Sequence, residues 1–175
     1  MEKTAQGNVV FKGVEIEPLA QSEEQVWRQL MRIMIVLPRA SEADLVAAGG
    51  LSGSEYAVLM HLSEAPQHAM RMIDLAGRLW LSQSAATRIV ERLCRAGLVA
   101  RRPSEYDKRG QVAVLTEEGH KQLEASYPGH LASVRRLVFD RLRGIDLGEL
   151  AAALAAIAAD EPMDRPTDRI TSPGR

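Results

Sequence analysis

The sequence predicts a mainly α-helical fold that contains one β-hairpin, and three observations support this prediction. Apolar residues recur every three or four positions through most of residues 18–159, as one face of an α-helix requires. Capping serines and terminating glycines or prolines divide this pattern into separate helices. A polar, turn-rich stretch at 103–110 lies between two short runs of extended character. The expected fold is therefore a group of helices around a two-stranded hairpin.

The composition is that of a globular protein. The length of 175 residues fits one domain, or one domain with a dimerisation appendage, rather than two full domains, and the chain is 46% hydrophobic and 26% charged. The longest apolar run, Leu150 to Ala159, is about half of the roughly 20 residues that span a bilayer. No apolar segment follows the N-terminal Met1-Glu2-Lys3-Thr4, and the single cysteine cannot form an internal disulfide. We therefore expect a cytoplasmic protein, kept in a reducing environment and without a membrane segment.

The N-terminal part is predicted to hold an arm and a long helix. Residues 1–17 sustain neither a helical nor a strand period, which predicts a flexible arm. From residue 18 the apolar spacing is helical as far as Pro38, and its apolar stripe is wider than one partner requires. The pattern allows residues 41–48 to continue beyond a kink at Pro38, until Gly49-Gly50 ends the helix. We expect residues 18–48 to form a dimerisation region.

The next helix has clear signals at both ends. Ser52 is an N-cap candidate, and Glu55, three residues later, completes the pattern of a capping box. The apolar residues Tyr56, Leu59, Met60 and Leu62 follow as core candidates. Pro66 marks the end of this helix, at about Glu64.

Two short helices and the hairpin complete a central lobe at residues 51–116. The first helix is predicted at 71–80, and a tight turn at Leu81-Ser82 leads into the second at 83–96. Gly97 closes the second helix at a position that needs a left-handed backbone. The strands Leu98 to Arg102 and Gln111 to Leu115 then bracket the charged tip at 103–110.

The C-terminal part is predicted to be helical and then disordered. Thr116 caps a long helix that extends to Arg143, with an interruption near Pro128-Gly129. Asp146 opens an Ala/Leu-rich helix to about Ala159. We expect residues 117–160 to contribute further dimerisation helices and the proline-rich tail 161–175 to be disordered.

The charge is unevenly distributed along the chain. The net charge is -1, yet residues 71–110 hold nine Lys/Arg against four Asp/Glu, while both flanking segments are net acidic. A basic segment between acidic flanks is typical of a surface that meets a polyanion, although an ordinary solvated face remains the alternative.

The helix at 83–96 separates into an apolar and a polar face. On a helical wheel Ala86, Ile89, Val90 and Leu93 cluster on one side. The opposite side carries small hydroxyl side chains near the N-terminus and arginines further along. Hydroxyl and amide side chains approach base edges and phosphates closely, and arginine suits guanine or phosphate. Glu91 lies at the centre of this face, where we expect it to orient Arg88 or Arg95 or to accept from a cytosine amine.

Helix, tight turn, helix and basic hairpin form the outline of a winged helix-turn-helix. The chain resembles the MarR family of transcriptional regulators over roughly Leu51 to Leu142. Five stretches carry the resemblance: Leu81-Ser82-Gln83-Ser84-Ala85-Ala86-Thr87-Arg88, Glu91-Arg92-Leu93, Ala96-Gly97-Leu98-Val99 with Arg101, Asp107-Lys108-Arg109-Gly110, and Leu115-Thr116-Glu117-Glu118-Gly119.

The resemblance implies a fold and a function. The fold is a winged helix-turn-helix DNA-binding lobe with N- and C-terminal dimerisation helices. The function is that of a cytoplasmic homodimer that binds a pseudo-palindromic operator in double-stranded DNA, usually represses, and is often released by a small aromatic or anionic effector. Helix 83–96 would enter the major groove and wing 103–110 the minor groove. Pro38 departs from the family pattern, because many relatives have an uninterrupted first helix.

Two sets of site residues follow. The predicted DNA-binding residues lie on helix 83–96, its cap and the wing: Ser82, Gln83, Ser84, Thr87, Arg88, Arg92, Arg95, Arg101, Asp107, Lys108 and Arg109. In the wing, the cations, Arg102 among them, point to phosphate, and Asp107 can hold Arg109 extended or pair with Arg101. By similarity, four residues are candidates for lining an effector pocket, although core packing is the alternative for each: Trp27, Arg32, Tyr56 and His61.

Other functional classes find less support in the sequence. Cys94 could sense oxidation, but its place at the edge of an apolar face favours a structural thiol. The four histidines form no i, i+4 pair and have no cysteine nearby, so we expect neither a metal nor another cofactor. No phosphate loop, dinucleotide fingerprint, H-E-x-x-H or nucleophile elbow is present, which argues against an enzyme. The main alternative is a protein-interaction module whose basic 71–110 surface binds an acidic partner.

Overall fold

The computed structural model describes residues 2–3, 8–103 and 110–159 and divides the chain into two units, residues 1–39 and 40–175. Helix α1 (Gln21–Gly49) contributes to both units. The predicted disordered tail lies outside the described residues, as does most of the wing tip.

The first unit begins with a small antiparallel sheet. Its strands are β1 (Glu2–Lys3), β2 (Val9–Phe11) and β3 (Val14–Ile16), in the order β1-β2-β3. Lys12 and Gly13 join β2 to β3 with φ values of 51° and 80°, as a two-residue hairpin turn with left-handed central residues requires. Residues 1–17 were predicted to be a flexible arm without a strand period, but their described residues form short antiparallel strands. Strands of two or three residues are too short to establish a period, although the Lys-Gly pair is a turn signal.

Helix α1 continues through Pro38 to Gly49. The predicted interruption at Pro38 is therefore absent: the proline supplies no N–H donor, but the helix continues on both sides of it. The predicted end is confirmed: Gly50 has a φ of 74°, in the left-handed region where glycine costs least.

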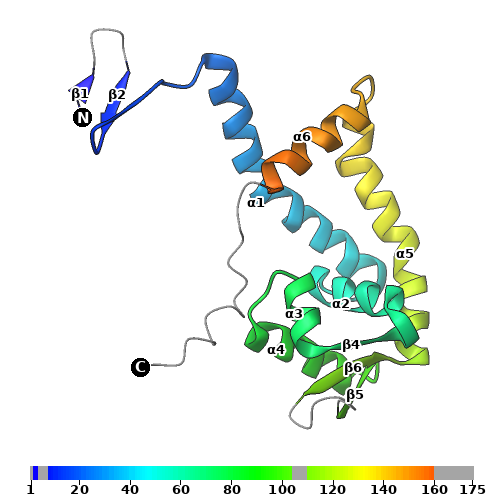
Figure 1. Ribbon diagram of the computed structural model, residues 1–175. Helices are drawn as coiled ribbons and strands as arrows, with labels where there is room; N and C mark the ends of the chain where they lie inside the picture. The colour runs from blue at the N-terminus through cyan, green and yellow to red at the C-terminus, as the bar shows by residue number, and fades with distance from the viewer. Residues whose placement is uncertain (1, 4–7, 104–109, 160–175) are drawn as a thin grey trace, which may run out of the picture. The chain divides into compact units, whose positions relative to one another are not determined.

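The second unit contains the winged lobe. Its helices are α2 (Gly53–Glu64), α3 (Met72–Arg78) and α4 (Gln83–Arg95), and its strands are β4 (Ala69–Arg71), β5 (Val99–Pro103) and β6 (Gln111–Leu115). The antiparallel sheet has the order β4-β6-β5, and Figure 1 shows it in green below α2 and α3. One continuous core joins the helices to the sheet: Leu45, Leu51, Tyr56, Val58, Leu59, Leu62, Met72, Leu75, Ile89, Val90, Leu93, Val99, Ala113 and Leu115.

Local signals explain most helix boundaries in this lobe. Ser52 and Glu55 form the predicted capping box at the start of α2. Ser82 caps α4 by accepting the N–H of Ala85, and Gly97, with a φ of 74°, follows its end. Helix α3 ends at Arg78 rather than residue 80, because Trp80 turns into the left-handed region with a φ of 54°. Strand β4 was not predicted, since its three residues become extended only by pairing with β6.

Helix α5 (Glu117–Leu137) leaves the lobe at the end of β6. It is continuous through Pro128, so the predicted interruption near Pro128-Gly129 is wrong. After a 3₁₀ turn, η2 (Phe139–Arg141), the chain forms α6 (Leu147–Ala159). Asp146 begins α6 as predicted, because its Oδ1 accepts the backbone N–H groups of Gly148 and Glu149.

The end of α1 and helix α5 meet through small and polar side chains. A Cβ on Gly129 would lie 2.5 Å from that of Ala48, so glycine permits a close approach of the two helices. The Asp44 carboxylate accepts hydrogen bonds from the Ser133 hydroxyl and from Arg136, the latter at 2.5 Å. The Ser133 bond, followed by that of Arg136, holds the pKa of Asp44 below its ordinary value despite the opposing effect of burial.

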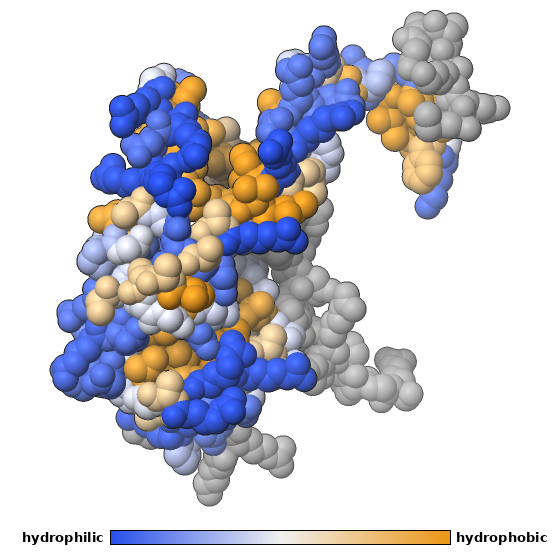
Figure 2. Space-filling view, turned by 180° about the vertical axis from the view of Figure 1, so that it is seen from behind, coloured by the Kyte–Doolittle hydropathy of each residue, from blue (hydrophilic) through white to orange (hydrophobic). Residues whose placement is uncertain are grey.

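Large apolar side chains remain exposed outside the winged lobe. In the first unit they include Val26, Trp27, Ile33, Met34, Ile35 and Val36, and in α5, α6 and their connection Leu131, Phe139, Ile145, Leu147, Leu154 and Ile157. Patches of this apolar surface appear in orange among the charged residues in Figure 2. Within the described ranges, no helix combines the length and apolar character needed to cross a bilayer.

Candidate nucleic-acid interface

Helix α4 has one buried face and one charged, solvent-facing face. Ala86, Ile89, Val90 and Leu93 are buried against the core, as the helical wheel predicted. The opposite face exposes Gln83, Ser84, Arg88, Glu91, Arg92 and Arg95. Core packing therefore fixes the helix without using the side chains that were predicted to contact DNA.

The hydroxyl groups at the start of α4 have a structural task. The Ser82 Oγ accepts the Ala85 N–H at 3.2 Å and lies 3.1 Å from the Ser84 Oγ. An N-cap of this kind typically contributes about 1 kcal/mol to helix stability. Gln83 and Ser84 remain exposed in the first turn, where a ligand could reach them.

Arg92 is held by helix α2. Its Nε donates to the Glu55 Oε1 at 3.0 Å, while the Glu55 Oε2 accepts from the backbone N–H and the hydroxyl of Ser52. Burial raises the pKa of Glu55, but the bonds from Ser52 and Arg92 outweigh it and hold that pKa below its ordinary value. Glu55 therefore caps α2 and anchors α4 with different oxygen atoms.

Arg101 joins the wing to helix α4. Its guanidinium donates to the backbone carbonyl of Thr87 at 3.2 Å and lies 3.6 Å from the Glu91 carboxylate. The expectation that Glu91 orients Arg88 or Arg95 is therefore wrong: its carboxylate pairs with Arg101 on β5. Strand β5 places Arg101 beside Glu91. Spacing along α4 could not predict this contact, because Arg101 lies outside the helix. Arg95 contacts Glu91 only through the backbone carbonyl, at 3.4 Å.

Arg88 is the arginine of the exposed α4 face with the greatest freedom. It is solvent-exposed, and no hydrogen bond or ion pair holds it among the residues that the structure describes. Arg92 and Arg95 each have a contact, so the three predicted contact arginines of α4 are not equivalent.

The wing is described only at its base. Arg101 and Arg102 lie on β5, and the predicted contact residues Asp107, Lys108 and Arg109 lie outside the described residues. The structure adds Arg71, which sequence reasoning did not select and which lines a hollow of about 340 Å³ together with Gln83, Thr87 and Arg101. The segment charge could have pointed to it, since Arg71 belongs to the basic 71–110 stretch.

The four predicted effector residues fall in different places. Trp27 and Arg32 are exposed in the first unit, whereas Tyr56 and His61 lie on α2 in the second. Tyr56 stacks on His130 of α5 with ring centroids 4.5 Å apart, and both line a hollow of about 640 Å³ between α2 and α5. His61 does not line this hollow. His130, which sequence reasoning did not select, has a buried Nδ1 without a hydrogen-bond partner in the described part of the chain.

Cys94 is half-buried on α4. Burial raises the pKa of its thiol, partly offset by the nearby Arg101, so the reactive thiolate is disfavoured. Across residues 2–3, 8–103 and 110–159, no three His, Cys, Asp or Glu side chains gather in a way that could hold a metal ion.

Helices α3 and α4, the turn between them and the β5–β6 hairpin define the winged helix-turn-helix class, with arginines on the exposed side of α4. Comparison with known proteins agrees. The chain matches Sco3205 of Streptomyces coelicolor, a MarR family transcriptional regulator solved in complex with DNA, with 32% identity and a TM-score of 0.78 over 86% of this chain and 98% of that one. AbsC, a MarR family regulator from the same organism, matches with 38% identity and a TM-score of 0.75 over 81% and 95% of the two chains.

The sequence pattern of the MarR family matches residues 49–110. The transcriptional repressor YetL of Bacillus subtilis is 35% identical over 88 residues, which are 50% of this chain and 53% of YetL. The chain thus spans about half the length of this curated relative. It belongs to the MarR family, whose members are transcriptional regulators rather than enzymes. The resemblance and the mainly helical winged fold inferred from the sequence are confirmed.

Proposed function

We propose that this protein is a homodimeric repressor that binds a pseudo-palindromic operator in double-stranded DNA. The observation that carries the proposal is the exposed Arg88, which no described residue holds by a hydrogen bond or ion pair, near the centre of a helix whose opposite face is buried. The DNA-bound state of Sco3205 supports a DNA ligand for this fold, and the repressor YetL supports repression.

In this proposal α4 lies in the major groove. Gln83, Ser84 and Thr87 approach the bases near the helix N-terminus, and Arg88 donates to a guanine or to a phosphate. Arg92, Arg95 and Arg101 are already engaged by protein groups, so they present charge to the phosphates from fixed positions. The wing residues Asp107, Lys108 and Arg109 extend the contact into the minor groove.

A second copy would cover the exposed apolar side chains of residues 18–37 and 131–159. Burial of about 25 cal/mol per Å² makes such surface costly to leave in water, and a two-fold dimer buries the same patch on both copies. Two α4 helices would then meet successive major grooves about 34–36 Å apart.

Release by an effector would use the hollow between α2 and α5. Its apolar wall includes Tyr56 and Leu123, and the imidazole of His130 adds a polar group that suits a small aromatic or anionic molecule. A ligand there would change DNA affinity only if it binds the two states of the dimer unequally.

Selection of bound fragments from genomic DNA, followed by affinity measurements with Arg88→Ala, tests the proposal. We expect a selected duplex to bind with a steep dependence on salt, and Arg88→Ala to weaken binding by roughly 1–3 kcal/mol if Arg88 contacts a base. Lys121→Ala is the control, because Lys121 is an exposed cation on α5 that lies outside both the face of α4 and the apolar segments proposed to form the dimer. No enrichment of any duplex, or binding to an acidic protein without a steep salt slope, would overturn the proposal in favour of a protein-interaction module.

A further inference from the structure

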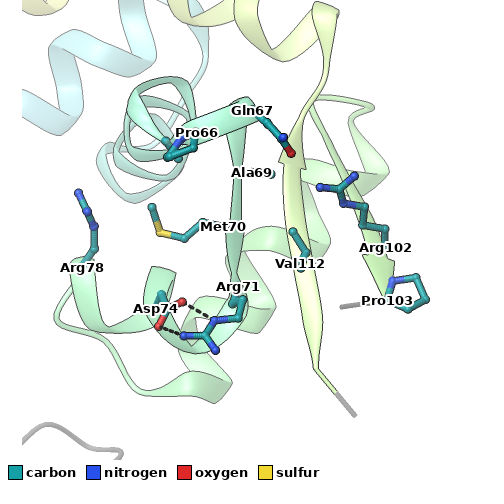
Figure 3. Close-up of a pocket in the computed structure, with 11 residues that line it drawn as sticks. Pro66, Gln67, Ala69, Met70, Arg71, Asp74, Arg78, Arg102, Pro103 and Val112 are labelled. Atoms are coloured by element: carbon teal, nitrogen blue, oxygen red, sulfur yellow. Dashed lines mark hydrogen bonds and ion pairs between the residues drawn. The ribbon is translucent and has the colours of Figure 1, made fainter. Parts of the chain in front are cut away.

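A second basic surface lies on the wing, away from the exposed face of α4. It is a hollow of about 650 Å³ around strand β4, bordered by α3 on one side and by β5 on the other. Figure 3 shows Arg78 and Arg102 on opposite sides of β4, with Arg71 and Asp74 at its end. Three elements therefore each place an arginine around one hollow.

The sheet register explains why Arg102 lies here and not beside α4. Arg71 and Arg102 both pair with Val112 of β6, so the three residues share one face of the sheet. The neighbouring Arg101 points to the other face, where it contacts Thr87. Two consecutive arginines of β5 thus serve two different surfaces.

Among the described residues that line this hollow, arginines outnumber carboxylates. Its described lining holds three arginines but one carboxylate, that of Asp74, which accepts from the Arg71 Nε at 2.7 Å and from its terminal nitrogen at 3.2 Å. Arg78 and Arg102 are exposed and have no ion-pair partner among residues 2–3, 8–103 and 110–159. Exposed cations that share a concave surface repel one another, and bound anions reduce this repulsion.

We propose that the hollow around β4 is a phosphate-binding site. Guanidinium groups recognise phosphate through paired N–H donors, and the ion pair with Asp74 holds Arg71 in a fixed direction. The hollow is open and polar, and its arginines come from separate elements, so that different phosphates of one backbone can each meet a guanidinium group.

The backbone of duplex DNA is the source of phosphate that the structure favours, and this choice rests on the proposed function. Arg71 also lines the hollow that contains Gln83, Thr87 and Arg101, so the two basic surfaces are continuous through this residue. A duplex on α4 that continued past the wing base would bring its phosphates to Arg102 and then to Arg78. The protein would therefore contact DNA beyond the base pairs read by α4.

The test compares the double variant Arg78→Gln/Arg102→Gln with the wild-type chain and with the control Lys121→Gln, whose exposed cation lies on α5 outside the proposed dimer segments. Affinity is measured across a series of salt concentrations for a selected duplex that extends roughly 10 base pairs beyond the protected region at each end. The slope of log affinity against log salt should fall by about 0.9 for each phosphate that an arginine no longer neutralises, and so by about 1.8 in the double variant. Lys121→Gln should keep the wild-type slope. Thermal unfolding of each variant confirms that all are folded.

A second arm identifies the source of the phosphate. Inorganic pyrophosphate is titrated into each protein by calorimetry. An unchanged salt slope together with pyrophosphate binding that the double variant loses would assign the site to a free phosphorylated molecule. An unchanged slope and no difference in pyrophosphate binding between the wild-type chain and the double variant would overturn the phosphate-site proposal. If the wild-type chain binds no duplex, the proposed function is overturned, and the pyrophosphate titration alone decides whether this hollow binds phosphate.

Discussion

Glu55 offers a way to separate two interactions that meet in one side chain. Its Oε2 completes the capping box with Ser52, and its Oε1 holds Arg92 of α4. Glu55→Ala removes both interactions. Glu55→Gln keeps a carbonyl oxygen for the capping box, in which glutamine is also acceptable, but places an uncharged amide against Arg92.

The expected magnitudes follow from these contacts. Loss of a capping interaction typically costs about 1 kcal/mol. The ion pair is worth less than about 1 kcal/mol, because 47% of the Arg92 side chain is exposed and water screens the interaction. We therefore expect Glu55→Ala to lower the free energy of unfolding by about 1–2 kcal/mol and Glu55→Gln by about 0.5 kcal/mol.

The pH dependence provides an independent measurement. Since the folded-state pKa of Glu55 lies below its ordinary value of 4.5, the carboxylate stabilises the fold fully above that pH. This contribution is lost as the pH falls through the lower, folded-state pKa. In urea unfolding at a series of pH values, the advantage of the wild-type chain over Glu55→Gln should therefore shrink below about pH 4.5.

Two results would refute this reasoning. If Glu55→Gln costs as much as Glu55→Ala at neutral pH, the charge rather than the capping box carries the stability. If the difference between the wild-type chain and Glu55→Gln stays constant down to the lowest pH at which both fold, the carboxylate is not stabilised in the folded state.

Three further predictions concern the same lobe. Gly119→Ala should destabilise the fold by about 1–3 kcal/mol, because the new Cβ would collide with the Leu98 carbonyl. Gly77→Ala should instead stabilise α3 by about 0.5–1 kcal/mol, because there is open space around Gly77. Chemical denaturation measures both effects. Cys94→Ser should leave the effect of peroxide on DNA affinity unchanged, since burial raises the pKa of the thiol, and a peroxide response that disappears in this variant would contradict the structural role. Arg109→Ala should weaken binding to most duplexes, with an extra loss at A·T-rich flanks, and an unchanged salt slope in gel-shift titrations would remove the wing tip from the interface.

Local chemistry made most of the fold predictable. The caps Ser52, Ser82 and Asp146 each act within three residues of their own position, so the sequence itself carries the signal. Proline was a weaker guide, because Pro38 and Pro128 both lie inside continuous helices. Strand β4 was not predicted because it pairs with β6, more than 40 residues further along the chain, and no local pattern indicates such a partner.

The site was predictable in its composition but not in its connections. The basic segment and the polar face of α4 located the surface, and the buried positions of α4 were predicted correctly. The partners of the arginines were not, since Arg92 and Glu55 are 37 residues apart and Arg101 and Thr87 are 14 apart. Whether an arginine is free or engaged depends on such distant contacts, and this distinction now singles out Arg88.

The bond from Arg101 to the Thr87 carbonyl has a geometric consequence for recognition. The acceptor is a backbone carbonyl, so a substitution of the Thr87 side chain does not remove it. The bond between α4 and β5 can therefore persist when residues that would contact bases change. In the proposed complex, the major-groove contacts of α4 and the minor-groove contacts of the wing would therefore keep the same spacing along the duplex. In that complex, substitutions on α4 would change the sequence preference without changing the spacing between the major-groove and minor-groove contacts.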